Sequence, residues 1–171
     1  RGSSSRAGVL HGGKPRFRQG EGQDTGSYCL AMANGKIALE IVTPEKRLVT
    51  DEVDEITGPG LWGEFGILPQ HTPYLVELDV GSLSYRKGSG RYFISVSGGY
   101  AEVGPDAVTV LAETAELAED IDVDRAKAAR ERAQNLISGK EETEDFSFDR
   151  AETALKRAIS RISVANRSGL G

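Results

Sequence analysis

Apolar and polar residues alternate along most of the chain, and glycine or proline separates the alternating segments. The alternation is clearest in residues 37–41, 76–80, 92–96 and 108–111. A period of two places successive side chains on opposite faces of a β-strand. Short strands that recur about every 8–12 residues are typical of all-β domains. This pattern predicts an antiparallel sandwich or barrel.

The pattern changes between Glu113 and Ala126, and apolar residues then recur every three or four positions. Asp122 is predicted to cap the first helix, with Asp124 in its first turn, where a carboxylate favours the helix dipole. A polar connector spans residues 138–147, and a second helix is predicted to begin near Phe148. The apolar positions of the two helices are Ala126, Ala129, Ala133, Leu136 and Ile137, then Ala151, Ala154, Leu155, Ala158, Ile162 and Ala165.

Two faces of this kind predict an antiparallel helical hairpin. Alanine side chains bury little area, and burial contributes roughly 25 cal/mol per Å². The hairpin is therefore expected to be only modestly stable and able to swing away or dock again.

The composition divides the chain into three parts. Residues 1–31 are rich in glycine, serine and arginine, with five basic and two acidic residues. We interpret them as a vector-derived or disordered extension, with the natural start at Met32. Residues 32–118 are predicted to form the N-terminal β-domain and residues 119–171 the C-terminal helical hairpin.

The overall composition excludes several classes of protein. Hydrophobic residues make up 38% of the 171 residues, and no run approaches the roughly 18–20 apolar residues of a membrane span. The single cysteine, Cys29, excludes an internal disulfide framework. Two histidines make a zinc site improbable on composition. A net charge of −5 argues against nucleic-acid binding.

Arginines follow one edge of each predicted helix. Arg150, Arg157 and Arg161 have i, i+7, i+11 spacing, and Arg125 and Arg132 are seven apart. Closing the hairpin would gather guanidinium groups that suit a phosphate. Asp122 would then accept hydrogen bonds from an adenine amino group or a ribose. Spacing alone favours the alternative, solvated arginines paired with glutamates one turn away.

Residues 64–73 are predicted to form an apolar loop. Within it, Glu64 and His71 are candidates for an acid/base pair. No nucleophile motif, Walker A motif or metal-ligand cluster accompanies them, so a structural or interface role is favoured.

Trp62 is predicted to be a packing residue; an exposed tryptophan here would instead mark a docking surface.

The order of several separated motifs resembles one known family, the epsilon subunit of F-type ATP synthases. The matching segments are residues 63–69 with His71, then residues 97–103, 108–112, 118–122 and 150–158. Together they span about Lys36 to Asn166. The chain departs from the pattern at Gln70, where glycine is usual, and in its longer, more acidic connector.

The resemblance implies a ten-stranded β-sandwich followed by a two-helix hairpin. It implies a non-catalytic rotor subunit that binds the gamma subunit and rests on the c-ring through the loop with Glu64 and His71. The extended hairpin would reach the alpha/beta head and restrain ATP hydrolysis. The implied place is the cytoplasmic face of the bacterial membrane, where the protein is peripheral through its complex.

Some bacterial members bind ATP when the hairpin is folded, and their motif matches residues 121–126. The resemblance therefore implies regulatory ATP, with no obligatory cofactor, at Glu116, Asp122, Arg125, Arg132, Arg157 and Arg161. The alternative hypothesis is a free-standing small-nucleotide-binding sensor without a rotary partner. A third, an acid/base enzyme using Glu64 and His71, is weaker.

Overall fold

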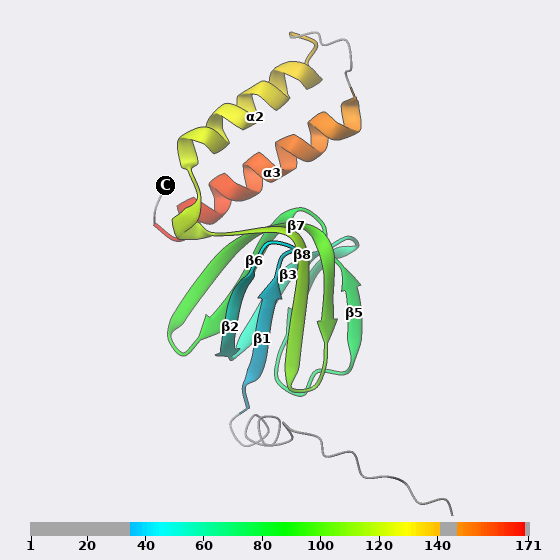
Figure 1. The fold of residues 1–171 in the computed structure, drawn as a ribbon, viewed down its shortest axis with the longest axis vertical. Helices are drawn as coiled ribbons and strands as arrows, with labels where there is room; N and C mark the ends of the chain where they lie inside the picture. Colours follow the sequence, from blue (N-terminus) through cyan, green and yellow to red (C-terminus); the bar gives the residue numbers. More distant parts are fainter. Residues whose placement is uncertain (1–34, 141–146, 170–171) are drawn as a thin grey trace, which may run out of the picture.

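The computed structural model describes residues 35–140 and 147–169. It contains a body of β-strands with two helices standing at one end (Figure 1). The extension predicted for residues 1–31 lies outside the described residues. Within the described ranges, no helix is both long and apolar enough to cross a bilayer.

Eight strands form the β-domain in the described residues, and every pairing is antiparallel except β1 with β8. Their order is β2-β1-β8-β7-β6-β3-β4, with β5 paired to β7. The β-sandwich expectation is confirmed, whereas ten strands and a purely antiparallel arrangement were wrong. The strands are β1 (Ile37–Val42), β2 (Arg47–Val53), β3 (Glu55–Gly60), β4 (Gly63–Ile67), β5 (Tyr74–Glu77), β6 (Gly81–Lys87), β7 (Gly90–Val103) and β8 (Ala107–Leu117).

Strand β7 explains part of the difference in strand number, because it continues through a glycine pair expected to break the pattern. It pairs with β6 along residues 90–96 and with β5 along residues 100–103. Gly98 and Gly99 have φ values of 66° and 108°. A β-carbon on Gly99 would lie 2.1 Å from the carbonyl oxygen of Leu111. Glycine therefore lets β7 bend against β8 without ending.

The alternating positions build one core inside the sandwich. Ile37, Leu39 and Ile41 on β1 are at most 1% exposed, and they pack in one cluster with residues from the other strands. Ala38 and Glu40 point outward from the same strand. The period of two thus fixes which face of each strand is buried.

The helical hairpin also forms as predicted. A short 3-10 turn, η1 (Ala118–Asp120), leads into α2 (Val123–Ile137), and α3 (Phe148–Arg167) runs back beside it. The predicted alanine positions Ala126 and Ala133 on α2 and Ala151 and Ala158 on α3 are buried. The seam is therefore narrow and made of small side chains.

The hairpin docks on the sandwich through α3, which contacts β6, β7 and η1. The apolar part of this contact is a small cluster of Ile121, Val164 and Ala165, with Phe93 packed against it. The remainder is polar, and it includes hydrogen bonds from the buried Ser160. The sandwich and the hairpin are thus joined by a limited interface.

Candidate functional site

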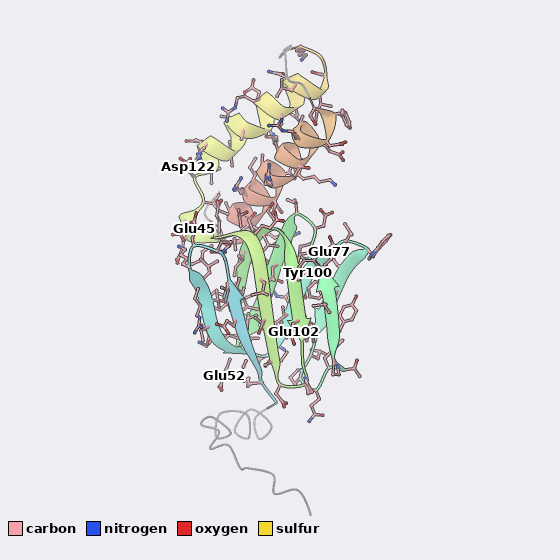
Figure 2. All side chains as sticks on the ribbon, turned by 45° about the vertical axis from the view of Figure 1, so that its right-hand side comes forward. Glu45, Glu52, Glu77, Tyr100, Glu102 and Asp122 are labelled. Carbon is pink, nitrogen blue, oxygen red and sulfur yellow. The ribbon has the colours of Figure 1, made fainter. Side chains whose placement is uncertain are left out.

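A polar hollow of about 380 Å³ lies where the hairpin meets the sandwich. Figure 2 shows Asp122 at this junction, just before α2 begins. Side chains from β8, η1, α2 and α3 contribute, so the hollow exists only while the hairpin is docked. It is lined by Glu116, Asp120, Asp122, Arg125, Ala126, Ala129, Arg132 and Arg161.

Glu116 and Arg161 form an ion pair that ties β8 to α3. Arg161 Nε lies 3.0 Å from both carboxylate oxygens of Glu116, and a terminal nitrogen lies 2.5 Å from Oε1. A planar guanidinium suits this paired geometry. The two side chains are about a third exposed, at 30% and 36%. The Arg161 guanidinium is therefore held in a defined orientation by a carboxylate of the sandwich.

The first turn of α2 forms one wall of the hollow. Asp122 caps the helix, because its Oδ1 accepts the backbone N–H of Arg125 at 2.9 Å. Helix N-termini carry partial positive charge and unpaired N–H groups, which attract anions. Ala126 and Ala129 leave space along the same wall because their side chains are short.

Arg125 and Arg132 are the two arginines of the hollow that are not paired with a carboxylate. Both are exposed, and neither forms an ion pair within the described residues. Glu116 already pairs with Arg161, and Asp122 already accepts the hydrogen bond that caps α2. The hollow therefore presents two free guanidinium groups next to a helix N-terminus, an arrangement that suits a phosphate.

Five of the six predicted nucleotide-site residues line this hollow, and Arg157 is the exception. Arg157 lies one turn before Arg161 on α3 and is partly buried. Asp120 lines the site but was not predicted. The acidic residues here are Glu119, Asp120 and Asp122. The backbone of the 3-10 turn determines that Asp120, rather than Glu119, faces the hollow.

Glu64 and His71 are not brought together. Glu64 is on β4, so the first half of the predicted loop is a strand, and it lines a hollow beside Lys156 and Ser160 of α3. His71 follows the end of β4, where its Nδ1 donates to the carbonyl oxygen of Thr72 at 2.8 Å. The described structure gives no acid/base pair here.

Gln70 takes the backbone conformation that glycine favours. Its φ is 64°, the one positive φ at a non-glycine residue in the described ranges. Its N–H donates to the carbonyl oxygen of Pro105 at 2.8 Å, which fixes the turn against the β7–β8 connection. The turn before His71 is therefore left-handed although glycine is absent.

Apolar side chains are exposed along one end of the sheet, in a row that we call the outer face. Tyr100 on β7 lies opposite Leu111 on β8, and Leu111 lies opposite Val42 on β1. Tyr100 is 51% and Leu111 55% exposed, and a hollow of about 400 Å³ lies over the three residues. Figure 2 shows Tyr100 beside Glu77 on this face.

Trp62 was predicted to be a packing residue, and this is wrong, since it is 97% exposed. It occupies the turn between β3 and β4, where Leu61 beside it is also exposed. The N–H of Leu61 donates to the carbonyl oxygen of Glu77 at 2.9 Å, so the turn adjoins β5. Exposed aromatic residues of this kind are common anchors in protein interfaces.

Two family descriptions match the chain in succession. Residues 36–118 match the ATP synthase delta/epsilon chain β-sandwich domain, and residues 119–166 match the long α-helix domain of the same chain. Together these matches cover most of the chain and nearly all the described residues.

Individual bacterial proteins are also similar. An ATP synthase epsilon chain of Syntrophobacter fumaroxidans is 55% identical over 103 residues, which is 60% of this chain and 77% of that protein. One of Nitratidesulfovibrio vulgaris is 50% identical over 104 residues, 61% of this chain and 78% of that protein.

A chain of the Euglena gracilis mitochondrial ATP synthase, in its OSCP/F1/c-ring structure, has a similar fold. The TM-score is 0.65 at 22% identity, covering 93% of this chain and 91% of that one. At this identity the likeness concerns the fold alone.

Proposed function

The chain belongs to the delta/epsilon family of ATP synthase subunits and is non-catalytic, and we propose that it joins the gamma subunit to the c-ring in the central stalk and restrains ATP hydrolysis. In this proposal, ATP bound at the hairpin junction holds the hairpin docked. Release of the hairpin would let it reach the alpha/beta head. The protein would work at the cytoplasmic face of the bacterial membrane, attached through its complex.

The outer face supports binding to another subunit. Tyr100, Leu111 and the neighbouring Leu75 are all at least half exposed, and they lie on strands whose opposite faces build the core. Exposed apolar patches of this kind mark interaction sites. We assign this face to the gamma subunit, and strand β4 with Glu64 and the turn with His71 to the c-ring.

The observation that carries the regulatory proposal is the convergence of both helices and the sandwich on one hollow lined by three arginines and three carboxylates. Arg125 and Arg132 come from α2, Arg161 comes from α3, and its partner Glu116 comes from β8. A ligand that contacts all of them binds only the docked arrangement. It therefore shifts the population towards docking by its differential affinity.

Calorimetry with ATP on the full chain tests the regulatory proposal. We expect saturable binding that Arg125→Ala weakens by about tenfold or more, because one charge-assisted contact is lost. Arg150→Ala is the matched control, because Arg150 is an exposed arginine of α3 outside the hollow. Absence of binding at millimolar ATP, or equal effects of the two variants, would remove ATP from the proposal. Arg157→Ala measured in parallel decides whether Arg157 belongs to the site.

Partner binding is tested separately by co-purification with a gamma subunit. Leu111→Asp places a charge in the middle of the outer face and should abolish the complex. Phe148→Asp is the control, since Phe148 is 53% exposed at the start of α3. A wild-type chain that binds ATP but never captures gamma would instead favour a free-standing nucleotide sensor.

A further inference from the structure

Another hollow, of about 300 Å³, lies on the hairpin, apart from the polar hollow at the hairpin junction that we call the nucleotide site. It shares no lining residue with that site, and we call it the rear hollow. Carboxylates line the nucleotide site at three positions, whereas none lines the rear hollow. Its lining residues are Arg130, Ile159, Ile162, Ser163, Asn166 and Arg167.

The two arginines of the rear hollow come from different helices, and neither has an acidic partner among the described residues. Arg130 projects from α2 and is exposed. Arg167 is in the last turn of α3, and its guanidinium carbon lies 5.8 Å from the centre of the Phe93 ring. Its position offsets the negative end of the helix dipole. This effect on the helix dipole gives Arg167 a structural role, but it gives none to Arg130.

Two neutral hydrogen-bonding groups complete the rear hollow. Ser163 is one turn before Arg167 on α3, so the two side chains lie on the same face of the helix. The Asn166 side chain adds an amide donor, and Ile159 and Ile162 form the apolar part of the lining. Two planar guanidinium groups with a hydroxyl and an amide match the many acceptor positions of a tetrahedral oxyanion.

We propose that the rear hollow binds a phosphate-type oxyanion between Arg130 and Arg167, with Ser163 and Asn166 as further donors. Such an ion would neutralise both guanidinium groups and connect α2 to α3. The alanine seam alone joins these helices weakly, so bound phosphate would hold the hairpin closed. Arg167 also contacts Phe93 on β7, which extends the connection to the sandwich. Only this effect on the hairpin depends on the proposed function; binding itself does not.

The test titrates the full chain with inorganic phosphate at constant ionic strength and follows binding by calorimetry. A saturable site that depends on Arg130 and Arg167 is expected, separate from any phosphate bound beside Arg125. Arg130→Gln and Arg167→Gln should each weaken binding by about tenfold, since each removes a charge-assisted contact. Arg150→Gln is the control, being an exposed arginine of α3 outside the rear hollow. Ser163→Ala provides a milder change that keeps every charge, and should weaken binding severalfold.

Failure of this proposal is distinguishable from failure of the nucleotide proposal. Arg125→Gln should weaken ATP binding and leave unchanged the phosphate binding that depends on Arg130 and Arg167, whereas Arg130→Gln should weaken that phosphate binding and leave ATP binding unchanged. Circular dichroism confirms that each variant is folded. Non-saturable phosphate binding would overturn the rear-hollow proposal. Equal effects of the Arg130 and Arg150 substitutions, or loss in Arg125→Gln of the phosphate binding that depends on Arg130 and Arg167, would also overturn it.

Discussion

Ser160 on α3 and Ser95 on β7 lie hydroxyl to hydroxyl at 2.9 Å, and both residues are less than a tenth exposed. Ser160 also donates to the carbonyl oxygen of Gly81 at 2.8 Å. The centre of the contact between hairpin and sandwich is therefore polar. Hydroxyl groups that separate regain hydrogen bonds to water, so undocking costs less than it would from an apolar contact.

Ser160→Ala should loosen the docked hairpin by about 1–3 kcal/mol, because the buried Ser95 hydroxyl and the half-buried carbonyl oxygen of Gly81 both lose this partner. Native-state hydrogen exchange in α3 measures the effect. Arg150→Ala is the control, since Arg150 is an exposed residue of α3 that lines neither the nucleotide site nor the rear hollow. Equal exchange in the two variants would mean that the serine contact does not hold the hairpin.

The ion pair between Glu116 and Arg161 should contribute modestly to docking. Both side chains are about a third exposed, so water and salt screen the pair, and a coupling energy of about 1 kcal/mol is expected. A double-mutant cycle with Glu116→Gln and Arg161→Gln measures it, and the coupling should shrink in high salt. A coupling near zero at low salt would show that the pair is not maintained in solution.

Gly99→Ala should be among the most damaging substitutions in the sandwich. The added β-carbon would lie 2.1 Å from the carbonyl oxygen of Leu111, at a φ of 108°. We expect a loss of about 3 kcal/mol or more in the free energy of unfolding. Gly66→Ala on β4 is the control, because no atom lies within 4 Å of its added β-carbon. Urea denaturation compares the two, and a similar small effect in both would contradict the strained geometry.

Two substitutions at the left-handed turn residue Gln70 should change the stability of the protein in opposite directions. Gln70→Gly removes the strain of a positive φ but adds freedom to the unfolded chain, so stability should rise by up to about 1 kcal/mol. Gln70→Val, with a branched β-carbon, should lower stability by more than about 1 kcal/mol. Thermal or urea unfolding distinguishes them. A destabilised Gln70→Gly would mean that the glutamine side chain is stabilising the turn.

Asp54 should make the sandwich sensitive to acid. A hydrogen bond from Lys36 and another from the backbone N–H of Gly88 lower the pKa of Asp54 below its usual 3.8. Because the folded-state pKa is the lower one, this stabilisation is present above the unfolded-state pKa. It is lost as the pH falls through the folded-state value.

Urea unfolding at a series of pH values tests the role of Asp54, with Asp54→Asn as the variant. The stability difference between wild type and variant should be constant near neutral pH and should shrink below about pH 4. Asp106→Asn is the control, since the Asp106 carboxylate forms no hydrogen bond or ion pair among the described residues. A difference that stays constant into strong acid would contradict the assignment.

Local periodicity predicted most of the fold, because burial follows the period of the side chains. Residues 37–41 are buried at alternate positions, and Asp122 caps α2 as expected. The strand number and the parallel pairing of β1 with β8 depend on contacts between segments far apart in the sequence. The glycine pair in β7 has the composition of a turn, and only its packing against Leu111 shows that the strand continues.

The candidate site was predictable to the extent that helical spacing places side chains on one face. Arg125, Arg132 and Arg161 meet as their spacing allows. Asp120 depends on a 3-10 turn that has no sequence period, and Arg157 lies one turn away from the hollow. Trp62 was misassigned because apolar residues are buried more often than exposed, and a turn residue escapes that rule.

Strand β7 carries Ser95 under the hairpin and Tyr100 on the outer face, five positions along the same backbone. If the gamma subunit binds at Tyr100 as proposed, a torque applied there would reach the base of the hairpin along the backbone of β7. Gly98 and Gly99 form the bend in β7 between these two residues. Under the proposed function, load at Tyr100 and ligand binding beside Glu116 would act on the same strand, because Ser95 of β7 pairs with Glu116 of β8.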